Sequence, residues 1–174
     1  MSNLTQRILF ALVAIPVVFF LLYWDYESRV ALMTILIGLA AWEWARMVAA
    51  KIDGPQMLIA TPVSAMLLTL AWAYRERFPG LIQVVSCEVV ALYLFVGFAR
   101  VRIENLFPWI ALHAMAPLYL GLWGGMSLML MGQGRGLMSS APFLVVMISM
   151  WVCDTFAYLF GRSFGKHPLA PQIS

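Results

Sequence analysis

The residues that could do chemistry in this sequence gather near its end, where one carboxylate lies in an apolar stretch. Asp154 is followed by Tyr158 and Arg162 at intervals of four residues. Such spacing puts carboxylate, phenol and guanidinium on one face of a helix. A carboxylate in a membrane-type helix costs about 2.5–3.5 kcal/mol, and a bound ion or polar substrate is a usual reason for keeping one. An Asp154–Arg162 ion pair is the structural alternative, but the intervening helix separates them by about 12 Å. The stripe therefore predicts a functional site centred on Asp154.

A basic strip punctuated by glycines follows this stripe. It carries Arg162, Lys166 and His167. Glycines expose backbone N–H groups and the cations supply donors, so the strip suits phosphate oxygens. It is not a nucleotide-binding P-loop, because only three residues separate Gly161 from Gly165 and no Ser or Thr follows Lys166. Basic residues are also expected at the cytoplasmic end of a membrane helix, so the strip alone is a weak signal.

Three further ionisable residues, Glu43, Glu88 and His113, interrupt apolar runs. Glu43 and His113 fall toward the same side of the membrane as Asp154, which predicts a cavity open on that side. Each residue also has a structural interpretation. Glu43 would pair with Arg46 one turn on, His113 would hydrogen-bond between helices, and Glu88 would do the same as a protonated carboxyl.

Composition indicates an integral membrane protein. Of the 174 residues, 63% are hydrophobic and 11% charged, and mean hydropathy is +0.88. Soluble chains are about 25% charged. The net charge of +3 is scattered over short loops and indicates no nucleic-acid partner. Cys87 and Cys153 lie in apolar runs, so we expect small buried residues and neither a metal cluster nor a disulfide.

Six apolar runs are long enough, or nearly so, to cross a bilayer core that needs about 20 residues per helix. They cover residues 8–24, 30–47, 57–74, 81–99, 108–130 and 141–160. We therefore predict an all-α fold, a polytopic transmembrane helical bundle forming a single domain over residues 1–174. Gly121 with Gly125, and Ala60 with Ser64, are small-residue pairs that predict close helix packing.

The distribution of Lys and Arg predicts the orientation of this bundle. One side carries seven of these residues: Arg7, Arg46, Lys51, Arg100, Arg102, Arg162 and Lys166. The other side carries four: Arg29, Arg75, Arg77 and Arg135. Both termini, and with them the basic strip, are therefore expected in the cytoplasm.

Taken as a whole, the segment from Trp151 to Ser174 resembles a known family. Its order W-x-x-D-T-x-A-Y-x-x-G-R-x-F-G-K-H-x-L-A-P-x-I-S is similar to the segment before the S-P-K-K-T-W-E-G motif of phosphatidate cytidylyltransferases, the bacterial CDP-diacylglycerol synthases. Ala41-Trp-Glu-Trp44 resembles an early Glu–aromatic pair of that family. The resemblance is close over the last 24 residues and loose over the rest.

The resemblance implies a nucleotidyltransferase of phospholipid biosynthesis in the bacterial inner membrane, with its active face cytoplasmic. It would transfer CMP from CTP to phosphatidic acid, giving CDP-diacylglycerol and pyrophosphate, with Mg²⁺ as cofactor. Asp154 would be catalytic and help to hold a metal. The residues expected to bind substrate phosphates are Tyr158, Arg162, Lys166 and Ser174, with Glu43 and His113 lining the cavity.

The sequence departs from the family after Ser174, where the paired lysines and a far C-terminal motif rich in Asp, Lys, Gly and His should follow. We therefore expect an N-terminal portion that is inactive alone, with the main metal ligands beyond Ser174. Two other classes stay open: a transporter or channel subunit that uses Glu43, Glu88 and Asp154 for protons or cations, and a non-catalytic membrane scaffold. A homo-oligomer also stays open.

Overall fold

The chain folds into helices alone across the part that the computed structural model describes, residues 3–165 without the side chains of residues 3, 4, 6–8, 10 and 11. The helices are α1 (Asn3–Trp24), α2 (Tyr26–Ala49), α3 (Ala60–Ala73), α4 (Leu81–Arg100), α5 (Ile103–Met131), the short 3-10 helix η1 (Leu137–Ser140) and α6 (Ala141–Phe164). The six α-helices confirm the all-α prediction and match the six apolar runs. The largest differences are at α1 and α5, each of which begins five residues before its predicted start.

Four of these helices, counting η1 with α6, are long and apolar enough to cross a membrane. They are Tyr26–Ala49, Leu81–Arg100, Ile103–Met131 and Leu137–Phe164. Two shorter apolar helical stretches, Leu12–Trp24 and Ala60–Ala73, accompany them. Large apolar side chains are exposed on every α-helix, which suits a lipid environment. The protein is an integral membrane protein.

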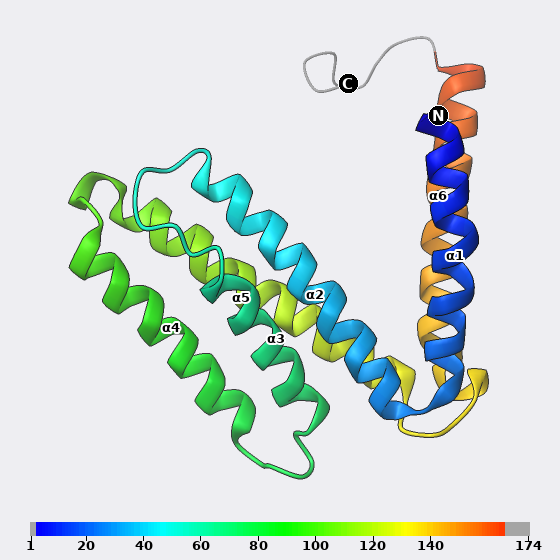
Figure 1. The fold of residues 1–174 in the computed structure, drawn as a ribbon, viewed down its shortest axis with the longest axis horizontal. Helices are drawn as coiled ribbons and strands as arrows, with labels where there is room; N and C mark the ends of the chain where they lie inside the picture. The colour runs from blue at the N-terminus through cyan, green and yellow to red at the C-terminus, as the bar shows by residue number, and fades with distance from the viewer. Residues whose placement is uncertain (1–2, 166–174) are drawn as a thin grey trace.

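A four-helix bundle of α2, α3, α4 and α5 forms the body of the molecule (Figure 1). The short α3 packs against α5 and α2, and α4 lies against α5 and α3. Glycines on α5 allow α3 to lie very close to it. A Cβ on Gly121 would lie 2.8 Å from Leu68 Cβ of α3, and one on Gly124 would lie 2.6 Å from Thr69 Oγ1 of α3. This confirms that the small residues of α5 serve helix packing.

The other two α-helices, α1 and α6, stand apart from this bundle (Figure 1). Within residues 3–165, α1 contacts only α2 and η1, while α6 contacts only α5 and η1. No residue of α6 is buried. The prediction that both cysteines are buried was wrong, because Cys87 on α4 and Cys153 on α6 are exposed. For Cys153 this follows from α6 itself, which buries none of its residues.

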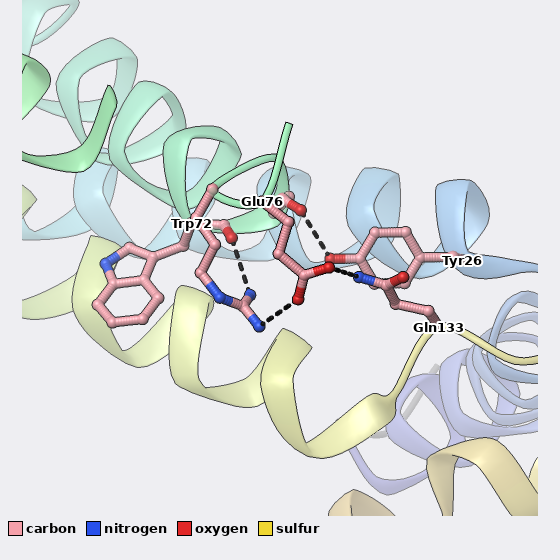
Figure 2. Close-up of polar contacts among 6 residues, drawn as sticks. Tyr26, Trp72, Glu76 and Gln133 are labelled. Atoms are coloured by element: carbon pink, nitrogen blue, oxygen red, sulfur yellow. Dashed lines mark hydrogen bonds and ion pairs between the residues drawn. The ribbon is translucent and has the colours of Figure 1, made fainter. Parts of the chain in front are cut away.

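The turns separate into two ends of the bundle, as the predicted spans require. The α2–α3 loop meets the start of α5, where Trp109 Nε1 donates to Pro55 O at 3.2 Å. At the opposite end, Tyr26 O–H donates to Ala73 O at 3.1 Å and Gln133 Nε2 donates to Glu76 Oε2 at 3.4 Å (Figure 2). Hydrogen bonds therefore tie the connecting segments together at both ends.

Candidate functional site

The predicted stripe lies on α6, where it is helical and exposed. Pro142 sits in the first turn of this helix, where its missing N–H is harmless, and the helix ends before Gly165. Arg162 Nη1 donates a hydrogen bond to Tyr158 Oη at 3.2 Å, which confirms that these two residues share a face. Since the Tyr158 oxygen accepts this bond, its own O–H remains available to donate to a further oxygen.

Asp154 is exposed one turn before Tyr158 and has no hydrogen bond or ion pair to any residue in the described part of the chain. The predicted separation from Arg162 holds, because Arg162 lies eight residues further along the helix and bonds to Tyr158 instead. Around this stripe the helix exposes apolar side chains such as Val152 and Phe156. Asp154 is therefore an unpaired carboxylate on a largely apolar helix, the kind of position that a bound group or a further protein surface has to compensate.

Two residues predicted to bind phosphate, Lys166 and Ser174, lie outside the described residues, as does His167. Arg7, one of the cations used for the orientation, has no described side chain. The structural part of the candidate site therefore consists of Asp154, Tyr158 and Arg162.

Glu43 lies on the outside of α2 and is not part of an enclosed cavity. Its expected partner Arg46 instead lies over the ring of Trp42, with Cζ 5.1 Å from the ring centroid, and makes no ion pair with Glu43. The next residue, Trp44, faces α5 and donates from Nε1 to Leu112 O at 3.0 Å. Trp44 therefore serves the packing of α2 against α5.

His113 is enclosed in the bundle, with an exposed fraction of 2%. Its ring stacks on Trp109 at a centroid distance of 4.3 Å, and its Nδ1 lies 2.9 Å from Trp109 O. A carbonyl oxygen only accepts, so Nδ1 must carry the proton, and Nε2 is left as a buried acceptor with no partner among the described residues. The bond is made within its own helix rather than between helices as the structural interpretation expected.

The structure does not bring Glu43, His113 and Asp154 into one cavity. Glu43 is exposed, His113 is buried, and α6 makes no contact with α2 among the described residues. Glu88 is exposed on α4 and makes no bond to a neighbouring helix there. The sequence gives the depth of a residue along its helix, but not the direction in which it faces its neighbours.

The described residues do not fit a magnesium site. No group of three or more His, Cys, Asp or Glu side chains lies close enough together within residues 3–165 to hold a metal ion. Asp154 is the one carboxylate of the stripe and would be at most a single ligand.

Arg29, which we expected to be a loop cation, has a completely buried side chain. It bonds to oxygen atoms of α1, of the end of α5, of the loop that follows and of η1. The sequence carried no signal for this role, because Arg29 directly precedes the apolar run 30–47, as a loop cation would. In the structure α2 begins at Tyr26 and therefore includes Arg29.

Comparison with known proteins identifies the family. The family described as "Cytidylyltransferase family" matches residues 5–174. This chain belongs to the cytidylyltransferase family. A curated "Phosphatidate cytidylyltransferase" of Pseudomonas aeruginosa is 28% identical over 188 aligned positions, which cover 98% of this chain and 62% of that relative.

This cytidylyltransferase-family chain thus spans about three fifths of the length of that relative. No solved structure gives a significant match. The family resemblance read from the last 24 residues of the sequence is confirmed.

Proposed function

We propose that the protein to which this chain belongs is a phosphatidate cytidylyltransferase. It would transfer CMP from CTP to phosphatidic acid and release pyrophosphate. The observation that carries the proposal is the family match over residues 5–174, since it includes the whole α6 stripe. A curated relative with this activity in its name aligns over nearly the entire chain.

In the proposed reaction, a phosphate oxygen of phosphatidic acid attacks the α-phosphorus of CTP. A new phosphorus–oxygen bond forms, the bond between the α-phosphorus and the oxygen bridging to the β-phosphorus breaks, and pyrophosphate carries away the electron pair. Such a reaction depends on holding two anions together and on stabilising the charge that develops. Exposed donors at the membrane surface would serve both needs.

Arg162 and Tyr158 supply two such donors side by side. The guanidinium retains N–H groups beyond the one given to Tyr158, and the phenol retains its own proton. Together they would bind neighbouring oxygens of one phosphate, with Lys166 and Ser174 adding further contacts. Asp154 lies one turn away, where it would orient a cationic or metal-bound group.

The described residues hold no Mg²⁺ site, so the ligands for the Mg²⁺ that the resemblance implies would come from outside residues 3–165, and we assign no step to the metal. We further propose that the chain lies in the bacterial inner membrane with the end of α6 in the cytoplasm. The supporting pattern is the excess of Lys and Arg on that side, and CTP would arrive from there.

The transporter alternative receives less support. Its three carboxylates, Glu43, Glu88 and Asp154, are exposed on α2, α4 and α6. These helices make no contact with one another within the described chain, so they offer no continuous path for an ion. A site at one helix end requires no such path.

Formation of labelled CDP-diacylglycerol from radiolabelled CTP and phosphatidic acid tests the proposal, with the full-length protein in lipid nanodiscs. We expect Asp154→Asn and Arg162→Gln each to lower turnover on the order of a hundredfold while the protein stays folded. Cys153→Ala is the matched control, because it neighbours Asp154 on another face of α6 and should leave turnover unchanged.

Absence of product from the wild-type full-length protein would refute the proposed activity. Full activity of Asp154→Asn would remove that residue from the site.

A further inference from the structure

The buried guanidinium of Arg29 joins four parts of the chain. Its Nε donates to Leu22 O at 2.9 Å, and Nη1 donates to Met131 O at 3.1 Å and Ser139 Oγ at 3.2 Å. Nη1 also lies 3.3 Å from Gly132 O, and Nη2 donates to Gly136 O at 3.3 Å. No carboxylate in the described chain forms an ion pair with it.

Helix ends explain how this charge is held without a carboxylate. Leu22 lies in the last turn of α1, and Met131 is the last residue of α5. The last carbonyls of a helix lack intrahelical partners and carry the negative end of the helix dipole. Two helix C-termini therefore meet at Arg29, and one planar group with five N–H donors serves both.

Neighbouring contacts make this place a junction. Gly136 N–H donates to Tyr23 O at 3.0 Å, and Ser139 Oγ donates to Met131 O at 3.1 Å. A small apolar core surrounds them, made of Leu22, Val30, Met33, Ala73, Leu128 and Met131. Partly buried Val18 from α1 and Phe143 and Leu144 from α6 pack against this core.

The junction is where α1 and α6 attach to the bundle. Figure 1 shows both helices rising from it, apart from the bundle. Neither contacts α3 or α4, and they do not contact each other within residues 3–165. The direction of α6 is therefore set at its first turn, although Asp154 lies more than three turns further along.

We infer that Arg29 is a positioning residue, which fixes α6 relative to the bundle and thereby sets where Asp154, Tyr158 and Arg162 lie. The effect on α6 is independent of what the protein catalyses. The effect on turnover rests on the proposed function.

The two cysteines of this chain provide the measurement, because Cys87 on α4 and Cys153 on α6 are both exposed. Spin labels on them, in the full-length protein in nanodiscs with any other cysteine replaced by serine, report the distance between bundle and α6 by double electron–electron resonance. We expect one narrow distance distribution in the wild type. Arg29→Gln should broaden or shift it, and Arg29→Lys should do so less because it keeps the charge but loses the planar fork.

Arg135→Gln is the matched control. Arg135 is an exposed arginine in the loop between α5 and η1, so its replacement should leave the distance distribution unchanged. An unchanged distribution in Arg29→Gln would overturn the inference. If that variant does not fold by circular dichroism, Ser139→Ala is measured instead, because it removes one acceptor of Arg29 and keeps the buried charge. An unchanged distribution in Ser139→Ala would then overturn it.

Turnover of the same samples gives the functional consequence. We expect Arg29→Gln to lower turnover about tenfold to a hundredfold, with partial recovery in Arg29→Lys, as for a remote change that misplaces a site. An altered distance with wild-type turnover would limit Arg29 to architecture. An inactive wild type with the expected distance changes would refute the proposed function and leave the positioning role standing.

Discussion

Gly125 on α5 offers the sharpest test of the packing between α3 and α5. A Cβ placed there would lie 2.5 Å from Trp72 Cβ, about 0.9 Å short of the 3.4 Å at which ordinary contact begins, and would also clash with Trp72 Cγ. Because both Cβ positions are fixed by their backbones, no side-chain rotation relieves this contact. Gly125→Ala must therefore push α3 away from α5.

The size of the effect follows from overpacking, which costs about 1–3 kcal/mol. Alanine also has a higher helix propensity than glycine, by about 1 kcal/mol, and this gain has to be removed from the comparison. Gly161→Ala on α6 supplies the correction, because a Cβ there meets nothing within 4 Å. The difference in unfolding free energy between the two variants should be about 1–3 kcal/mol, with Gly125→Ala the less stable.

Thermal unfolding in detergent, followed by circular dichroism, measures this difference. For a chain of this size, about 2–4 °C accompanies each kcal/mol, so Gly125→Ala should melt roughly 2–12 °C below Gly161→Ala. Gly121→Ala should fall between them, because its closest contact, Leu68 Cβ, is 2.8 Å away. Equal melting temperatures for Gly125→Ala and Gly161→Ala would refute the described approach of α3 to α5.

Two titrations test the end of the bundle that contains Arg29. The Ser28 N–H, 2.8 Å from Asp25 Oδ1, and the Ser28 hydroxyl lower the pKa of Asp25. The Asp25 carboxylate therefore stabilises α2 fully above the ordinary carboxyl pKa, and this stabilisation is lost as pH falls through the lowered pKa. The NMR chemical shift of the Ser28 amide should change with pH, with a midpoint below the ordinary carboxyl pKa, and should stay constant in Asp25→Asn. A midpoint at or above the ordinary carboxyl pKa would contradict the cap that Asp25 forms on α2. Tyr74 O–H donates to Glu27 Oε2 at 2.5 Å, which raises the pKa of the phenol, so this contact stabilises the fold below pH 10.0 and is lost as pH rises through the raised value. The absorbance difference between wild type and Tyr74→Phe should show a phenol that ionises above the ordinary phenol pKa. Glu27→Gln should lower the midpoint of this ionisation. An unchanged midpoint in Glu27→Gln would contradict the Tyr74–Glu27 hydrogen bond.

The elements were predictable because membrane helices are encoded by length and hydropathy. The predicted starts of α4 and α6 match the structure, and the predicted ends of α4 and α5 each lie one residue short. The predicted end of α6 lies four residues short. The start of α5 was missed because its first turn, Ile103–Phe107, contains Glu104 and Asn105 and does not read as apolar. An apolar run predicts only the membrane-spanning part of a helix, and it does not predict a polar turn that extends the helix beyond the membrane.

The site was predictable only along its own helix. Spacing alone placed Tyr158 and Arg162 on one face, because residues four apart on a helix are always neighbours. The cavity with Glu43 and His113 needed the rotation of three helices about their axes, which small differences in packing decide. Arg29 was missed for a related reason: its partners are mainly backbone carbonyl oxygens, which every residue has, so no pattern of side chains reveals it.

The polar residues of the helices fall into two groups with different meanings. Arg29 and Trp109 are buried and hydrogen-bonded at the two ends of the bundle, so the fold accounts for them. Glu88 and Asp154 are exposed on apolar helices and unpaired within the described chain, so the fold leaves their desolvation in a membrane uncompensated. Of these two, only Asp154 shares a helix face with a guanidinium and a phenol that are already in contact. Function is therefore better sought on α6, the helix with no buried residue, than inside the packed bundle.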